Sequence, residues 1–254
     1  MTKPLLERQV SLIAHLTSGA AIFSRGGDPA PGLEGIDPAL LRVEAQFSYA
    51  KRMEKITAVL PKTFELLGSG KEALVRAFVE SCPPATLSRL ENARQFHRFL
   101  LSRWLHEEPD PPYMRDVAAC EIACAEVDTD PEQYQADRAN AEGAHRSAVR
   151  RSPNVVLLRC AYDVRSIFEA PLPNPPSLAG DGRVGAVPAK RDTPLVIAMP
   201  PGADGPQVLE VLPAIFDLLA ALDDWTDAAP TSEGAEFAKL LANLAAHGLI
   251  EVRR

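Results

Sequence analysis

The chain has 254 residues, of which 46% are hydrophobic and 24% are charged, the proportions of an ordinary globular protein. Its net charge of −7 excludes a strongly basic nucleic-acid binder. No apolar run approaches the ~18 residues of a membrane span, and charges within Met1–Gln9 replace the apolar core of a secretion signal. We therefore expect a cytoplasmic protein whose four cysteines stay reduced.

Residues 1–150 are predicted to form an N-terminal helical domain. Asp37 followed by Pro38 is typical of a helix start, with the carboxylate as cap and proline at the first helical position. Pro61 should split the long helix that follows, and Gly68 should end it. The expected helices form an irregular bundle and lie at 4–19 (or 4–26), 38–60, 61–67, 71–79, 87–105, 113–127 and 131–150.

Residues 151–254 are predicted to form a second, α+β domain. Residues 154–168 are rich in β-branched and aromatic side chains, which favours one bent strand or two short ones. A proline-rich loop, 171–190, follows. Two strands joined by turn residues then predict a hairpin, and two helices and a short strand follow it. These later elements are expected at 194–199, 207–211, 214–225, 236–247 and 249–252.

Cys120 and Cys124 lie four residues apart on a predicted helix, so their thiols share one face. Two thiolates there would supply half of a zinc site, which normally has four ligands. No CxxC, HExxH or paired-histidine motif lies near them in the sequence. Cysteine is also among the most buried residue types, so packing in the core is the alternative interpretation. Both interpretations stay open at this point.

Motifs of known enzyme classes are missing from the sequence. It contains no nucleophile-elbow, P-loop or dinucleotide-binding pattern. The five histidines are scattered, with no ligand spacing among His15, His97, His106, His145 and His247. We therefore expect a protein that is not an enzyme and that holds no metal or cofactor of its own.

Acidic residues dominate one long stretch of the second domain. Between Arg191 and Lys239 there is no lysine or arginine. The same stretch contains nine acids: Asp192, Asp204, Glu210, Asp217, Asp223, Asp224, Asp227, Glu233 and Glu236. This pattern indicates either a solvated surface or a docking surface for a neutral or cationic partner.

The stretch Tyr49–Val127 contains the segments YAKRMEKITAVLPKTFELLG, LVRAFVESCPP, FHRFL and PYMRDVAACEIACAEV. It resembles the helical domain of accessory proteins that work with multinuclear non-heme iron oxidative enzymes, the group of methanobactin-type and thiaglutamate-type systems. The segment PNVVLLRCAYDVRSIFEA matches a later feature of that family, a proline followed by a strand that ends in an aromatic residue. The resemblance covers most of residues 40–170, and length and layout favour the thiaglutamate type.

Residues 193–254 separately resemble the peptide-recognition domain of systems that modify ribosomal peptides. The matching order is a hairpin (PLVIAM, QVLEV), two helices (AIFDLLAALDDWTD, EFAKLLANLAAHG) and a closing strand. The resemblance implies a small winged-helix-like fold with a short antiparallel sheet. The segment 228–234 is too short to show that fold's middle helix clearly.

Together the resemblances imply a non-catalytic subunit that captures a precursor peptide. It would present the cysteine-containing end of that peptide to a partner iron enzyme, forming a heterodimer or larger complex and binding no nucleic acid or membrane. The iron would belong to the partner. The alternative is a winged-helix DNA-binding regulator, although the last predicted helix contains one lysine and no arginine.

The family binds its leader peptide as an added strand, which places the site on the third strand and the facing side of the last helix. Strand addition relies on main-chain hydrogen bonds, so the receiving strand needs no chemical motif. Alternation puts Val208 and Glu210 on one face and Leu209 and Val211 on the other, more core-like face. The predicted contact residues are Gln207, Val208, Leu209, Glu210, Val211, Lys239, Asn243 and His247. The acids nearby suggest a leader that carries lysine or arginine.

Overall fold

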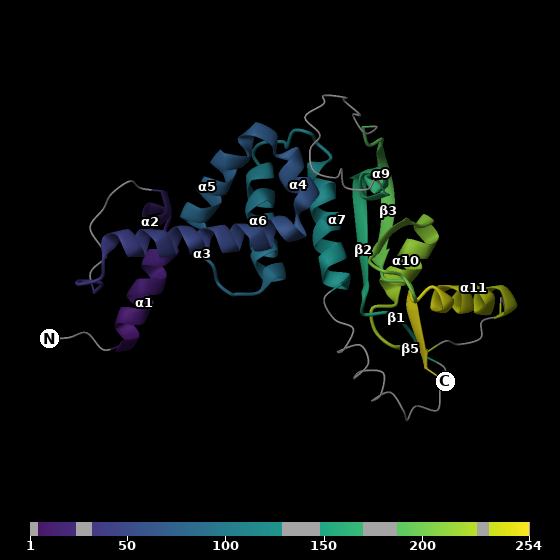
Figure 1. Cartoon of the computed structure of the whole chain (residues 1–254). Coiled ribbons are helices and arrows are strands. Elements are labelled where there is room, and N and C mark those ends of the chain that lie inside the picture. Colours follow the sequence, from purple (N-terminus) through teal and green to yellow (C-terminus); the bar gives the residue numbers. More distant parts are fainter. Residues whose placement is uncertain (1–4, 24–31, 129–147, 170–186, 228–233, 254) are drawn as a thin grey trace. The chain divides into compact units, whose positions relative to one another are not determined.

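The computed structural model describes residues 5–23, 32–128, 148–169, 187–227 and 234–253. The chain divides into two compact units, Met1–Pro112 and Tyr113–Arg254 (Figure 1). Helices come first and sheets after them, so the predicted α+β class is confirmed. The division precedes the predicted boundary at residue 150. The reason is that the helix at 114–127 packs on strands of the second unit and the strand at 148–151 pairs within it.

The first unit consists of helices, as predicted. They are α1 (Leu5–Leu16), α2 (Gly19–Phe23), α3 (Pro38–Val59), α4 (Pro61–Leu66), the 3-10 helix η1 (Gly68–Gly70), α5 (Lys71–Ser81) and α6 (Arg89–Trp104). The Asp37 carboxylate accepts a hydrogen bond from the Ala39 N–H at 2.8 Å, which caps α3. Pro61 lacks an N–H and separates α3 from α4, as the sequence predicted.

Aromatic rings from α4, α5 and α6 form the centre of this unit. The ring centroids of Phe78 and Phe96 lie 4.9 Å apart in an edge-to-face arrangement, and both side chains are fully buried. Phe64 packs on Phe96 at 5.1 Å. Aromatic pairs of this kind add about 0.5–1.5 kcal/mol beyond the burial of their area. The cluster therefore fixes α4 and α5 against α6.

The second unit has two antiparallel sheets of three strands each, where one short sheet was expected. The first sheet has the order β2 (Val155–Tyr162), β3 (Lys190–Ala198), β4 (Gln207–Glu210), and β3–β4 is the predicted hairpin. The second has the order β5 (Thr226–Asp227), β1 (Ala148–Arg151), β6 (Ile250–Arg253). The helices of this unit are α7 (Met114–Val127), α9 (Arg165–Glu169), α10 (Pro213–Ala221) and α11 (Gly234–Ala246).

Helices cover both faces of the sheet β2–β3–β4. Val196 and Ala198 of β3 belong to a cluster with α10 and α11, whereas Leu195 and Ile197 point to the opposite face, which α7 covers. All four side chains are at most 1% exposed. Figure 1 shows α7 beside β2 and α10 beyond β3. A strand that is buried on both faces usually has a continuous run of apolar residues, and residues 195–198 have this pattern.

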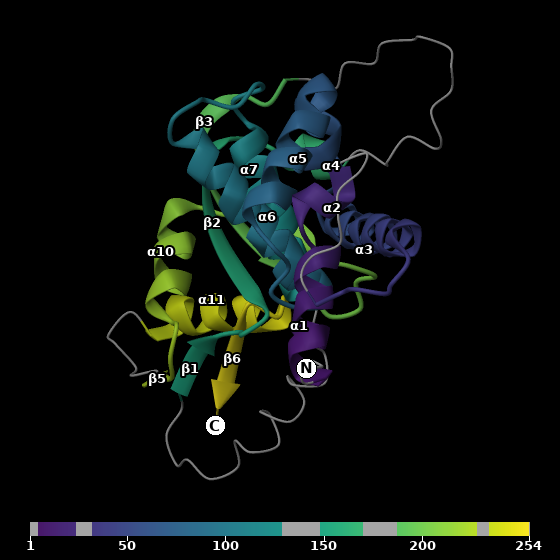
Figure 2. The ribbon, with the colours of Figure 1, turned by 90° about the vertical axis from the view of Figure 1, so that its left-hand side faces the viewer.

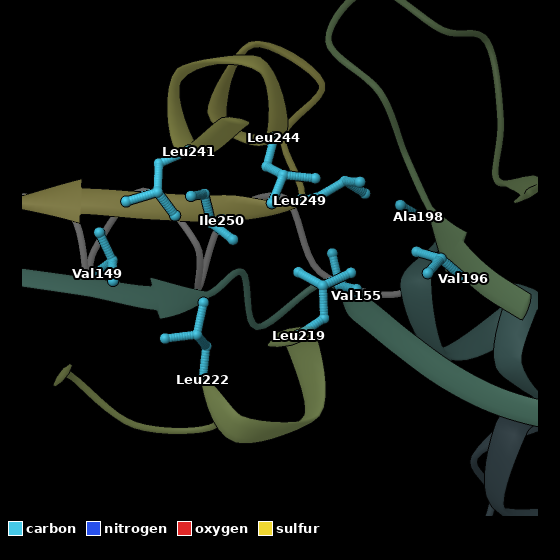
Figure 3. Packing of buried hydrophobic residues seen from close by; sticks show 10 residues of the cluster. All are labelled: Val149, Val155, Val196, Ala198, Leu219, Leu222, Leu241, Leu244, Leu249 and Ile250. Atoms are coloured by element: carbon cyan, nitrogen blue, oxygen red, sulfur yellow. The ribbon is translucent and has the colours of Figure 1, made fainter. Parts of the chain in front are cut away.

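One hydrophobic cluster connects both sheets to α10 and α11. Figure 3 shows its side chains pointing toward one another from the two strand layers and the two helices. Its ten buried members are Val149, Val155, Val196, Ala198, Leu219, Leu222, Leu241, Leu244, Leu249 and Ile250. In Figure 2, β1 and β6 lie side by side next to α11, which packs on β6. The cluster therefore sets the position of one sheet against the other.

Several predicted elements differ from the structure. Residues 148–150, expected at the end of a helix, begin β1, because they pair with β6 about a hundred residues further along the chain. Residues 154–168 form one strand and the short helix α9. The rest of the predicted helix at 131–150 and most of the proline-rich loop lie outside the described residues. No helix in the described ranges is both long and apolar enough to cross a membrane.

Candidate functional site

The predicted third strand, β4, lies at one edge of the sheet β2–β3–β4. Its residues pair with β3 in antiparallel register, Gln207 with Ala198 and Glu210 with Leu195 at the two ends. Within the described residues β4 pairs with no other strand. An edge strand presents a row of unpaired N–H and C=O groups, which another strand can bind. The structure therefore gives β4 the position that strand addition requires.

The register shows which backbone groups of β4 face outward. The Val211 N–H donates to the carbonyl oxygen of Pro194 at 3.1 Å. In an antiparallel pair, successive residues direct these groups alternately toward the partner and away from it. Residues 207, 209 and 211 therefore bond to β3. The N–H and C=O groups of Val208 and Glu210 point to the free edge.

The side chains of β4 alternate between the two covered faces of the sheet. Val208 and Glu210 lie on the α7 side, opposite Ile197 and Leu195. On the other side Val211 packs against the hydrophobic cluster, as expected, and Leu209 is half-buried. Gln207 and Glu210 are exposed. The strand is thus anchored at its Val211 end, and no second described strand pairs with its outer edge.

Glu210 is the centre of an ion-pair network that the sequence analysis did not predict. Its carboxylate lies 2.6 Å from the Arg165 guanidinium and 2.5 Å from that of Arg191, and both arginines also contact Asp163. Hydrogen bonds from Arg191 lower the pKa of Glu210, and hydrogen bonds from Arg165 chiefly lower that of Asp163. The two negative charges of the acids balance the two positive charges of the arginines. Glu210 therefore already has counter-charges within the chain.

Arginines from outside the acidic stretch contact other acids of that stretch as well. Arg159 donates to Asp192 at 3.0 Å, and the charge of Asp217 also raises the pKa of Arg159. The proposed acidic docking surface is therefore partly neutralised. The sequence predicts a strand that begins at Pro194, whereas β3 begins at Lys190 and so includes Arg191. A longer hairpin register would have placed Arg191 near Glu210.

The three predicted helix residues are all exposed: Lys239 and Asn243 lie on α11, and His247 directly follows it. Leu241 and Leu244 face the core, whereas Phe237 is 36% exposed. Helix α11 packs against β6, and the helices that pack against β4 are α7 and α9. The structure brings the five strand residues together, and it leaves the three helix residues on a solvated face.

That exposed face also bears on the alternative of DNA binding. Lys239 is the single basic residue among the residues of α11. Phosphate contacts dominate the affinity of proteins for DNA, and they require several cations on one surface. No observation on α11 favours this alternative, which stays a hypothesis.

The cysteine pair of the sequence analysis lies on α7, against the sheet. Cys120 is fully buried, and a hydrogen bond with the thiol of Cys160 on β2, together with burial, raises the pKa of Cys120. Burial raises the pKa of the half-buried Cys124 to about 11. Neither thiol is activated as a nucleophile or metal ligand. Across the described ranges, no three His, Cys, Asp or Glu side chains lie close enough to hold a metal ion.

No protein-family model matches the sequence, and no curated protein is significantly similar to it.

Proposed function

We propose that the chain is a non-catalytic accessory subunit that binds a ribosomally made precursor peptide along the outer edge of β4. The main support for this proposal is the geometry of that edge. Val208 and Glu210 direct their backbone N–H and C=O groups outward, and helices cover both faces of the sheet. A peptide strand added there would gain main-chain hydrogen bonds without disturbing the core.

The covered faces also favour a peptide as the ligand. Helices α7 and α9 pack against β4, so side chains of a peptide added beside β4 would lie next to these helices. Strand addition alone gives affinity, and such flanking surfaces give specificity. We propose that the leader contacts mainly β4, and that Lys239, Asn243 and His247 contribute further contacts.

The partner follows from the resemblance described above. We propose that it is a non-heme iron oxidative enzyme, and that the cysteine-containing end of the bound peptide reaches the iron of that enzyme. The role of this chain is then positioning, which converts an encounter of enzyme and peptide into an effectively intramolecular step. This assignment needs no metal ligand and no catalytic side chain in the chain itself.

The test is reconstitution from separately purified components. Neighbouring genes are searched for an iron enzyme and a short cysteine-ending peptide, the full chain is combined with both, and iron content and peptide mass are measured. The proposal expects peptide modification only when all three components are present, and no more iron in the isolated chain than in a control protein. Stoichiometric iron in the isolated chain, lost when Cys120 and Cys124 are replaced by serine, would contradict it.

A further inference from the structure

The helical unit contains a buried cation whose charge is not balanced. Arg52 of α3 is 8% exposed, and its Nε–H donates to the side-chain oxygen of Asn92 at 3.2 Å. A terminal guanidinium nitrogen donates to the Gln95 side chain at 2.9 Å, and the guanidinium lies 4.4 Å from the centre of the Phe78 ring. All these partners are neutral. Among the described residues Arg52 forms no ion pair.

Burying an unpaired guanidinium is costly, because it loses hydration without gaining a counter-charge. Burial lowers the pKa of Arg52, and the nearby Cys82 side chain only partly opposes this shift. No carboxylate of the described chain acts on it. A buried arginine in this state gains stability from any anion that reaches it.

A small cavity gives access to Arg52. Its floor consists of the buried side chains of Ile22, Arg52 and Val79, and its rim is half-buried. The rim residues are Leu16, Thr17, Ser48, Tyr49 and Pro84. The residues come from α1, α2, α3, α5 and the segment after α5, and α1, α2 and α5 lie around α3 in Figure 2. The cavity therefore forms where the first helices of the unit meet.

We propose that this cavity binds the carboxylate of a small acid or of a partner peptide, with one carboxylate oxygen directed at Arg52. The volume, about 10 Å³, is close to that of one water-sized group, so one oxygen of the anion fits inside and the rest of the anion stays at the rim. The Ser48 hydroxyl has no hydrogen-bond partner in the described residues and can turn to donate. Arginine and hydroxyl donors suit an oxygen that only accepts.

This inference stands apart from the peptide-binding proposal, since every residue of the cavity belongs to the first unit. A carboxylate matches both the charge of Arg52 and the size of the cavity, and a water matches only the size. A bridging water would fit the volume but would leave the guanidinium without a counter-charge. A carboxylate supplies both the oxygen and the charge, while its carbon remains at the half-buried rim.

The test is a titration of the full-length, ¹⁵N-labelled chain with acetate, followed by NMR at the Nε–H resonance of Arg52. We expect a saturable shift with a dissociation constant on the order of millimolar, which is reasonable for a ligand of so few atoms. Acetamide, the neutral analogue of the same shape, is expected to cause none. N-acetylglycine serves as a model of the carboxyl end of a peptide. Tighter binding of acetate indicates a small acid as the natural ligand, and tighter binding of N-acetylglycine indicates a peptide.

Three variants make the result specific. Ser48→Ala should weaken acetate binding by roughly threefold to tenfold, and Arg52→Met should abolish it. Arg42→Met changes an arginine of the same helix outside the cavity and should leave binding unchanged. If Arg52→Met does not fold, the Ser48→Ala result alone decides. The proposal is overturned if acetate gives no saturable shift, if acetamide acts like acetate, or if chloride binds more tightly.

Discussion

The sheet β2–β3–β4 has two edge strands, β2 and β4. They differ in how many of their outward backbone N–H groups already donate hydrogen bonds within the chain. Edge strand β2 is eight residues long, and N–H groups at both of its ends are occupied. The Val155 N–H donates to the Ser152 carbonyl at 3.0 Å, and the Tyr162 N–H donates to the Asp116 carboxylate at 2.9 Å. Edge strand β4 has four residues, and within the described chain its outward N–H groups have no such partners.

The difference shows how one sheet protects one edge and leaves the other open. The end of β2 is irregular between Cys160 and Tyr162, and Asp116 of α7 caps the backbone there. Bulges and caps are the usual means of closing an edge. At β4 the ion-pair network around Glu210 fixes the side chains and leaves the main chain free. We therefore place the added strand at β4.

The largest effect is expected from proline at an inward position of β4. Leu209→Pro removes the N–H that bonds to β3, so the hairpin loses a ladder hydrogen bond and the new ring strains the pairing. We expect a loss of roughly 2–3 kcal/mol in the free energy of unfolding, measured by urea denaturation. An unchanged unfolding midpoint would show that the register of β4 is wrong.

Acid should affect the two edges in opposite ways. The pKa values of Asp163 and Glu210 near β4 are lowered, so their stabilising effect is present above about pH 4 and is lost as the pH falls through the folded-state values. Burial raises the pKa of Asp116 near β2, so its ionisation opposes folding as the pH rises through that value. Hydrogen exchange between pH 3 and pH 6 measures both edges separately.

In that measurement, amides of β4 should lose protection on acidification, whereas the Tyr162 amide should not. The double variant Asp163→Asn, Glu210→Gln should remove most of the acid sensitivity of β4. If both edges lose protection at the same pH, their electrostatics do not differ as described.

A smaller effect is expected from opening the protected edge. Asp116→Ala removes the acceptor of the Tyr162 N–H and should cost about 1 kcal/mol, measured by thermal unfolding. Asp116→Asn retains an acceptor oxygen and is the matched control, with a smaller loss. We expect the Tyr162 amide to exchange faster in Asp116→Ala and not in Asp116→Asn. Equal exchange in both variants would mean that Asp116 does not cap this edge.

Local signals in the sequence predicted much of this structure. The Asp37–Pro38 start, the break at Pro61 and the β3–β4 hairpin each depend on residues close together in the chain, and all are confirmed. Gly248, at a φ of 72°, follows α11 as predicted, and the Leu249 N–H donates to the Leu244 carbonyl. Such caps and turns are encoded within a few residues, so a single sequence reveals them.

Features that depend on distant residues were not predictable. Residues 148–151 form a strand only because β6 pairs with them, and nothing in their own pattern indicates it. The network that neutralises Glu210 needs Arg165, which comes from a different element far along the chain. The balance of charge at the candidate site is therefore a property of the fold, and composition alone suggested a more acidic surface than the one observed.

The most direct test of the account compares proline at an outward position of each edge. Val208→Pro removes an outward N–H from β4, and Arg159→Pro removes one from β2, because alternate residues of central β3 bond to its two neighbours. Binding of the precursor peptide to each full-length variant is measured by calorimetry, with urea unfolding as the check on folding. The account predicts at least a tenfold loss of affinity for Val208→Pro and little change for Arg159→Pro. The reverse order, or parental affinity in both folded variants, would contradict peptide capture at β4.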